Sequence, residues 1–346
     1  MLIILFILMI CCASSAKFAK PGEFHKDYLS KEITTAVNGV FVILVFLRHF
    51  TQYVKFSDSP IDRLFLDFNT ALGQLLVTTF LFYSGYGIIC SIKAKGESYV
   101  NTIPRKRISS VWLHFAIAVG LFLITDVIIG KEYQLKTILL AFTGWSSIGN
   151  SNWYIFAVLF LYLFVFISYK ICKKNMFFGL VLTSAMILIW VFVMMRMKRP
   201  SYTYNTLVCY PLGMLYALFK PQIEKIVMKN DIIYSTVLAA AFISMLLMYK
   251  HRNGGFIEHS IWSIIFIVLV LLVTMKVRLS NGFLTFLGSH VFGIYILQRI
   301  PMLILQHLGL NQNPYMFLVL SFIITVPMTL VFDWIMKKID IKLKLV

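Results

Sequence analysis

The sequence predicts an all-α membrane protein, a polytopic transmembrane bundle of about ten helices. Three observations lead to this prediction. Hydrophobic residues make up 60% of the 346-residue chain, charged residues only 13%, and the mean hydropathy is +0.84, which lies well outside the usual soluble range. The apolar residues gather in runs of roughly 20, the length that crosses a bilayer core about 30 Å thick. These runs do not alternate between polar and apolar residues, as the strands of a membrane β-barrel would.

Each run is bounded by charged residues or by Gly, Pro and Asn, which favour turns. The ten runs cover about 36–54, 70–92, 109–130, 152–171, 176–196, 202–219, 231–249, 257–276, 284–307 and 314–336. The connections are short, and the longest expected ones are 93–108 and 131–151. Because no linker or internal repeat interrupts the series, we expect one transmembrane domain over residues 30–346.

The formal net charge of +18 could suggest a nucleic-acid partner, but the placement of the basic residues indicates another cause. With the start of the first run inside, the inner segments carry 21 of the 32 Lys and Arg residues, and the outer segments carry 9. This asymmetry is the positive-inside bias of membrane proteins. It predicts a multi-pass protein of the cell membrane with both termini cytoplasmic, lipid as its surroundings and no nucleic acid as partner.

Residues 1–29 form an apolar extension followed by a basic segment. The stretch MLIILFILMICCASSA at residues 1–16 is short for a span and lacks the cationic start of a signal peptide. We expect an uncleaved, membrane-associated extension or a misassigned start. Cleavage after Ala16 would instead place the basic residues of 17–35 outside, against the charge bias. The five cysteines show no metal-ligand spacing, so no metal and no tightly bound cofactor are expected.

Two ionisable residues stand side by side in the first span, in the stretch FVILVFLRHFTQYV. Arg48 and His49 lie within its last two turns on the expected outer side. A charge inside a bilayer costs around 2.5–3.5 kcal/mol on insertion scales, so such residues are candidates for function. Histidine suits proton abstraction near neutral pH. The alternative is structural, with His49 as an interhelical hydrogen-bonding group and Arg48 as an anchor that reaches the headgroups.

Two further basic positions are candidates. Arg105, Lys106 and Arg107 precede the expected third helix, where guanidinium groups beside a helix start suit phosphate binding. The alternative is that they only hold this loop on the inner side. Arg299 precedes Pro301 near the outer face, where it could meet an anionic or polyol ligand or simply the headgroups. Motifs of soluble hydrolases, metalloproteases and nucleotide-binding proteins are absent from the sequence.

Six strings then resemble a known family when they are taken in order: NGVFVILVFLRHF, FLFYSGYGI, PRKRI, NWYIFAVLFLYL, YNTLVCYPLGMLYALFK and FLGSHVFGIYILQRIPM. They are similar to the integral-membrane acyltransferase family 3, over about residues 30–336. The resemblance implies a ten-helix bundle that transfers an acyl group, usually acetyl, from cytoplasmic acyl-CoA. It also implies that the acceptor is a hydroxyl of a carbohydrate or lipid-linked glycan.

The resemblance also implies roles for particular residues. His49 matches the family histidine of the first helix and would be the general base. The family has Arg or Lys where this chain has Asn38, so Asn38 or Arg48 would stabilise or orient the reacting groups. Gln298 stands where many members have a second histidine, so it would contact the acceptor together with Arg299. The remaining implied contacts are Arg105, Lys106, Arg107, Ser84 and Tyr86 with acyl-CoA, and Trp153 and Tyr154 with the acceptor.

We therefore predict an O-acyltransferase that modifies an exported or cell-surface carbohydrate, with acetyl-CoA or another acyl-CoA as donor substrate. Two alternatives stay open at the level of the sequence. One is a multipass transporter or flippase for a glycan or lipid-linked sugar, with Arg48, His49 and Arg299 along its path. The other is a catalytically inactive relative, which the replacements Asn38 and Gln298 would favour.

Overall fold

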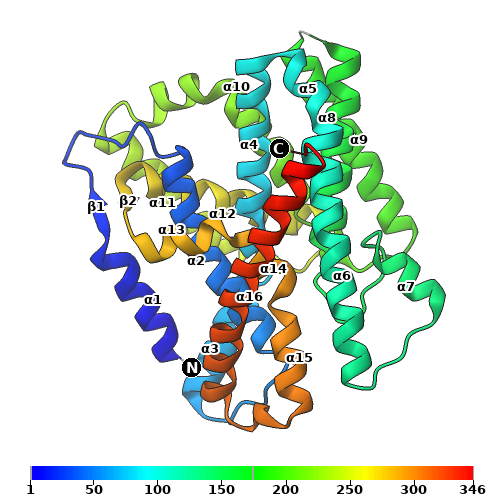
Figure 1. Ribbon diagram of the computed structural model, residues 1–346. Coiled ribbons are helices and arrows are strands. Elements are labelled where there is room, and N and C mark those ends of the chain that lie inside the picture. The colour runs from blue at the N-terminus through cyan, green and yellow to red at the C-terminus, as the bar shows by residue number, and fades with distance from the viewer. Residues whose placement is uncertain (1, 174, 346) are drawn as a thin grey trace.

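The structure, a computed structural model, describes residues 2–173 and 175–345 and is almost entirely helical (Figure 1). The helices and short helical turns are α1 Leu2–Ser14, α2 Lys31–Phe50, α3 Pro60–Leu72, α4 Leu75–Lys95, α5 Glu97–Ile103, the π-helical η1 Pro104–Ser109, α6 Ser110–Ile128, α7 Leu135–Ala141, α8 Trp153–Cys172, α9 Met176–Arg196, η2 Ser201–Thr203, α10 Cys209–Val227, α11 Asp231–Met248, α12 Phe256–Lys276, α13 Gly282–Ser289, α14 Val291–Leu297, α15 Arg299–His307, η3 Leu310–Gln312 and α16 Pro314–Lys342. Two short strands, β1 Ala16–Phe18 and β2 Val277–Leu279, pair antiparallel with Lys17 opposite Arg278.

The prediction of an all-α multi-pass membrane protein is confirmed. In the described part of the chain, eight helical segments are long and apolar enough to cross a membrane, and a ninth is added if α13 and the bent α14–α15 segment form one span broken by 64°. The count falls short of ten at the run predicted for 202–219. There the helix, α10, begins only at Cys209 and ends at Val227, so it includes Lys220, Glu224 and Lys225. The expected bounds of that span were wrong because the polar stretch after Pro200 folds as turns.

The basic stretch before the third span is helical, although a loop was expected at 93–108. Gly96, with a φ of 58°, ends α4, and α5 begins at the next residue. From Glu97 the chain then continues through the π-helical turn η1 into α6 as one long segment that ends at Ile128. The three basic residues therefore project from a helix of fixed orientation, and their directions differ.

Glycines allow two pairs of helices to approach closely. A Cβ at Gly85 of α4 would overlap the backbone oxygen of Tyr210, and one at Gly213 of α10 would overlap that of Phe82. In the same way Gly39 of α2 and Gly288 of α13 each face the backbone of the other helix. Small residues at helix crossings are the usual means of close packing in membranes. These two crossings fix α2 and α4, the helices that line both cavities described below.

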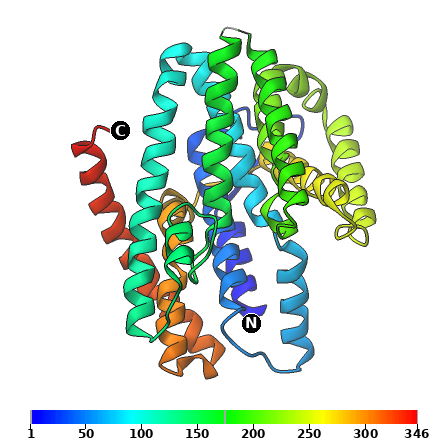
Figure 2. The same cartoon turned by 90° about the vertical axis from the view of Figure 1, so that its right-hand side faces the viewer.

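Figures 1 and 2 show that the start of α2, the helix α5 and the C-terminal end all lie in the upper half of the molecule. The turn that includes η3 and the helices α3 and α15 lie at the lower end. Helix α1 rises along one flank from the lower end toward β1, and its Leu8 packs against Ala36 and Leu284. The upper end thus contains three of the segments predicted to be cytoplasmic, but α1 begins at the lower end, opposite the side predicted for the amino terminus. That this end faces the cytoplasm stays a prediction.

Candidate active site

A cavity of about 400 Å³, here called the outer cavity, surrounds the end of α2. Five separate parts of the chain line it: the last turns of α2, the turn between α3 and α4 with the start of α4, the loop before α8, the turn η2, and the α14–α15 segment. Arg48, His49, Trp153 and Arg299 all line this cavity. The structure therefore brings together four residues that the sequence places as far as 251 positions apart.

His49 lines the outer cavity from the last turn of α2. Its ring centroid is 6.0 Å from that of Tyr295, and its Nδ1 atom is buried without a hydrogen-bond partner among the described residues. Gln298 lies beside it, fully buried, and donates an amide hydrogen to the carbonyl of Tyr295 at 3.2 Å. Two charged groups, those of Arg48 and Arg299, line the same cavity as the imidazole. A neutral imidazole here can accept a proton, and no carboxylate among the described lining residues competes for it.

The two guanidinium groups of the cavity differ in how they are held. Arg299 donates to the Ser151 hydroxyl at 3.1 Å, to the Tyr53 hydroxyl at 3.2 Å and to the Gln52 side-chain oxygen at 2.7 Å. Burial raises the pKa of Tyr53, and the charge of Arg299 opposes this shift. The side chain of Arg48 makes no hydrogen bond or ion pair with any described residue. Arg299 is therefore oriented by neutral groups, and Arg48 remains available to a ligand.

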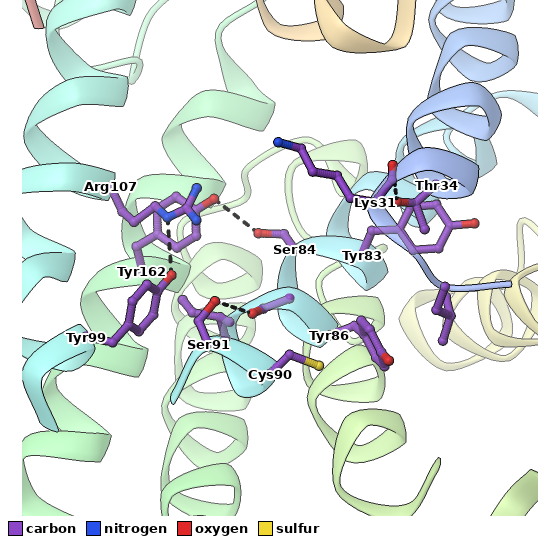
Figure 3. A pocket seen from close by; sticks show the side chains of 13 residues that line it. Lys31, Thr34, Tyr83, Ser84, Tyr86, Cys90, Ser91, Tyr99, Arg107 and Tyr162 are labelled. Atoms are coloured by element: carbon purple, nitrogen blue, oxygen red, sulfur yellow. Dashed lines mark hydrogen bonds between the residues drawn. The ribbon is translucent and has the colours of Figure 1, made fainter. Parts of the chain in front are cut away.

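A second cavity, the inner cavity, lies toward the opposite end of α4 and has a volume of about 470 Å³ (Figure 3). Arg107 lines it and donates from Nε to the Tyr99 hydroxyl at 3.3 Å. Ser84 and the hydroxyl of Tyr162 are 3.1 Å apart across its wall. Lys31 and Tyr86 also line it. Two cations and several hydroxyl groups in the wall of one cavity suit a phosphate-bearing ligand.

Three tyrosines lie at or near the walls of the two cavities. Tyr83 lines the inner cavity and Tyr295 the outer one, and the hydroxyl of each is buried without a partner among the described residues. Tyr154 packs on both main apolar clusters, as Tyr83 does, and its ring centroid is 5.5 Å from that of Tyr295. We call Tyr83, Tyr154 and Tyr295 the tyrosine septum. The unpaired hydroxyls of Tyr83 and Tyr295 lack the hydrogen bonds that buried polar groups normally make.

Comparison with family models gives one match, to the acyltransferase domain of the acyltransferase 3 family, over residues 36–336. The chain belongs to the acyltransferase 3 family. It is therefore a multi-pass membrane acyltransferase. No curated protein and no solved structure matches the chain.

Within this acyltransferase, several predicted site residues do not reach the cavities. Arg105 points to the C-terminal segment, where it donates to the carbonyl of Leu343 at 3.4 Å, and Lys106 is exposed. Asn38 lies about three helical turns from His49, lines neither cavity, and has a buried side-chain oxygen without a partner among the described residues. Gln298 packs behind the outer cavity, and Tyr154 belongs to the septum. Of the residues expected to bind acyl-CoA, only Ser84, Tyr86 and Arg107 share a cavity.

The sequence reasoning missed the amides of the outer cavity. Gln52, Gln74, Asn150 and Asn152 all line it. A signal for the last two was present, because the string GNSNW places amides directly before Trp153. Tyr295 could also have been found, because it precedes Arg299 by four residues, the spacing that places two side chains on one helix face. Among the described residues no group of three or more His, Cys, Asp or Glu could hold a metal ion.

Proposed function

We propose that this acyltransferase transfers an acetyl group from acetyl-CoA in the inner cavity to a hydroxyl of a carbohydrate in the outer cavity, with His49 as general base. The observation that supports the proposal is the pair of polar cavities that α2 and α4 both line, one with Arg107 and the other with His49. Each cavity has a volume typical of a small-molecule site.

The donor would bind with its phosphates at the inner mouth. Arg107 and Lys31 supply cations there, and Ser84 with Tyr86 lies deeper in the same cavity. Thr34 lines the inner cavity and Arg48 the outer one, and these residues are 14 positions apart on α2, or about 21 Å along the helix. A CoA arm has an extended form and carries amide groups. It could therefore cross the septum and hydrogen-bond to the unpaired hydroxyls of Tyr83 and Tyr295.

The reaction would take place at the outer side of the septum. His49 takes the proton of the acceptor hydroxyl as its oxygen attacks the thioester carbonyl. The tetrahedral intermediate carries its negative charge on the former carbonyl oxygen, and Arg299 or Arg48 stabilises that charge. The intermediate then expels the CoA thiolate, which receives the proton from His49. The products are the ester and CoA–SH, and the imidazole is neutral again.

The experiment that tests this proposal uses the full chain in nanodiscs with acetyl-CoA and a panel of glycans. CoA release and acetylated glycan are measured for the native protein, His49→Ala and the control His307→Ala, whose exposed histidine lines neither cavity. We expect transfer by the native protein and the control but not by His49→Ala. Transfer that continues without His49 would exclude it as the base.

One observation favours a second candidate, an inactive relative that binds a glycan without acylating it. Asn38 replaces the basic residue of the family pattern, and its side-chain oxygen is buried and unpaired in the described part of the chain. If the native protein binds glycans but releases CoA from no acyl-CoA tested, the inactive relative or a transporter is the better description. The variant Asn38→Arg restores the basic residue of the family pattern. In the same assay it would distinguish an inactive relative from a transporter, because only an inactivated enzyme is expected to regain transfer.

A further inference from the structure

The outer cavity is continued by a further cavity of about 510 Å³. It lies among the end of α3, the turns around η2 and the start of α12. Four residues line both spaces: Arg48, Gly73, Gln74 and Tyr202. We call this second space the side chamber. Because Arg48 and Tyr202 form part of both walls, a ligand longer than one sugar could occupy the two spaces together.

Positive charge dominates both walls. Arg48 and Arg299 line the outer cavity, and Arg48 and Arg252 line the side chamber, whereas no Asp or Glu appears among the described lining residues of either. Arg252 donates to the carbonyl of Tyr249 and lies 3.9 Å from the centre of that ring. Within the described chain, none of the three guanidinium groups has a carboxylate partner. The carbonyl of Arg252 also contacts Nδ1 of His259 at 3.1 Å, and Nε2 of that histidine is buried and unpaired among these residues.

Arg48 lies within the α2 span, where an unpaired charge requires compensation, and Arg252 lies in the turn before α12. The acyl-transfer step supplies one negative charge, on one oxygen, at a single place near His49. Three guanidinium groups exceed what that oxygen needs, and Arg252 lines only the side chamber, away from His49. A ligand that carries its own negative charge would interact with the guanidinium groups that the reaction does not use.

The other lining side chains are of the types that proteins commonly use to bind sugars. Trp153, Tyr202 and Trp262 provide aromatic faces, and Gln74, Asn152 and Asn205 provide amides. Aromatic faces pack on the apolar side of a sugar ring, and amides both donate to and accept from hydroxyl groups. We propose that the outer cavity and the side chamber form one acceptor groove for an extended, negatively charged saccharide, whose carboxylate or phosphate binds at Arg48 and Arg252. This proposal takes from the proposed function only the role of the bound saccharide as acceptor.

Binding without a donor tests the proposal separately from catalysis. The full chain in nanodiscs is titrated with trigalacturonate and with its methyl ester, which has a similar size but no charge. Quenching of tryptophan fluorescence reports binding, because Trp153 and Trp262 line the groove. Maltotriose phosphate against maltotriose forms the second pair and distinguishes phosphate from carboxylate. We expect at least one charged probe to bind about tenfold more tightly than its neutral partner, and added salt to reduce that difference.

Substitutions of Arg252 test whether the side chamber binds the negatively charged group of the probe. Arg252→Gln is expected to weaken binding of the preferred charged probe about tenfold, to leave the neutral partner nearly unchanged, and to be partly rescued by Arg252→Lys. The matched control is Arg196→Gln, because Arg196 is exposed, packs on Phe192 and lines neither space. It should bind all probes like the native protein.

Equal affinity for the charged and neutral members of both pairs, including absence of binding by all four probes, would overturn the proposal. So would a charge preference that Arg252→Gln leaves intact, because the side chamber would then not hold the anionic group. A charge preference that depends on Arg252, in a protein that transfers no acyl group, would support this groove and contradict the proposed function. Acyl transfer to neutral glycans with no charge preference would support the proposed function and contradict this groove.

Discussion

Two groups of ionisable residues in the bundle differ in how their charge is balanced. Along α16, Asp340 contacts Nε2 of His114 at 3.0 Å, and Asp333 contacts Nδ1 of His290 at 2.5 Å. These pairs tie α16 to α6 and to the junction of α13 and α14. In the outer cavity, Arg48, His49 and Arg299 have no carboxylate partner among the described residues.

The difference indicates which charges serve the fold and which serve a ligand. A histidine that faces a carboxylate is balanced within the protein, so the pair can link helices without any further group. A guanidinium that faces only neutral groups is not neutralised within the protein, so it can attract a negatively charged ligand that enters the cavity. The α16 pairs should therefore affect stability, and the outer-cavity residues should affect binding and rate. The predictions below test this division.

The largest effect is expected for His49→Ala. Loss of the general base should lower the acyl-transfer rate about 10²–10⁴-fold, whereas helix content and thermal unfolding should change little. The rate is measured as CoA release in nanodiscs, and unfolding by circular dichroism. If His290→Ala lowered the rate per folded molecule as much as His49→Ala does, the division between the two groups would be wrong.

Arg299→Lys should have the next largest effect. The lysine keeps the charge, but it cannot reproduce the fork of hydrogen bonds to Ser151, Tyr53 and Gln52. We expect kcat to fall roughly 100-fold, the order of magnitude seen when one group that stabilises an oxyanion is lost. A rise in the acceptor KM with unchanged kcat would instead assign Arg299 to ground-state binding.

Variants of the α16 pairs should lower the stability of the protein and leave the transfer rate nearly unchanged. Asp340→Asn keeps the shape of the side chain and removes the charge opposite His114. Because both side chains of this pair are mostly buried, with exposures of 17% and 13%, we expect a loss of about 1–3 kcal/mol in the free energy of unfolding. The transfer rate per folded molecule should stay within about twofold of the native value, because the contact is outside both cavities of the site. A large fall in kcat at native stability would place this pair in the reaction.

The smallest effect is expected at the inner mouth. Arg107 is exposed and already bonded to Tyr99, so water weakens its attraction to a phosphate. Arg107→Gln should raise the KM for acetyl-CoA about fivefold at unchanged kcat, and Lys106→Gln, whose side chain lines neither cavity, should not. Equal effects of the two variants would indicate a general surface charge effect and not a donor site.

The six strings that resemble the family contain residues needed for helix packing as well as residues that line the cavities. In FLFYSGYGI, Ser84 and Tyr86 line the inner cavity, but Gly85 between them faces the backbone of α10. The glycine is required by the helix crossing, and the neighbouring side chains then point into the cavity. Sequence reasoning found the string but could not separate these roles, because a helix alone does not reveal which face meets another helix.

The sequence alone determined the class of the protein and the most prominent candidate residues. Apolar length and the asymmetry of basic residues are local properties of a chain, and lipid imposes strict requirements on both. For the same reason Arg48 and His49 were visible inside their apolar run. The tertiary structure decided which polar groups meet: it places Arg107 at the inner cavity but directs Arg105 and Lys106 elsewhere, and it gathers Gln74, Asn152 and Tyr202 around His49. A cavity is formed by the packing of segments that are distant in the chain, so no single stretch of sequence contains it.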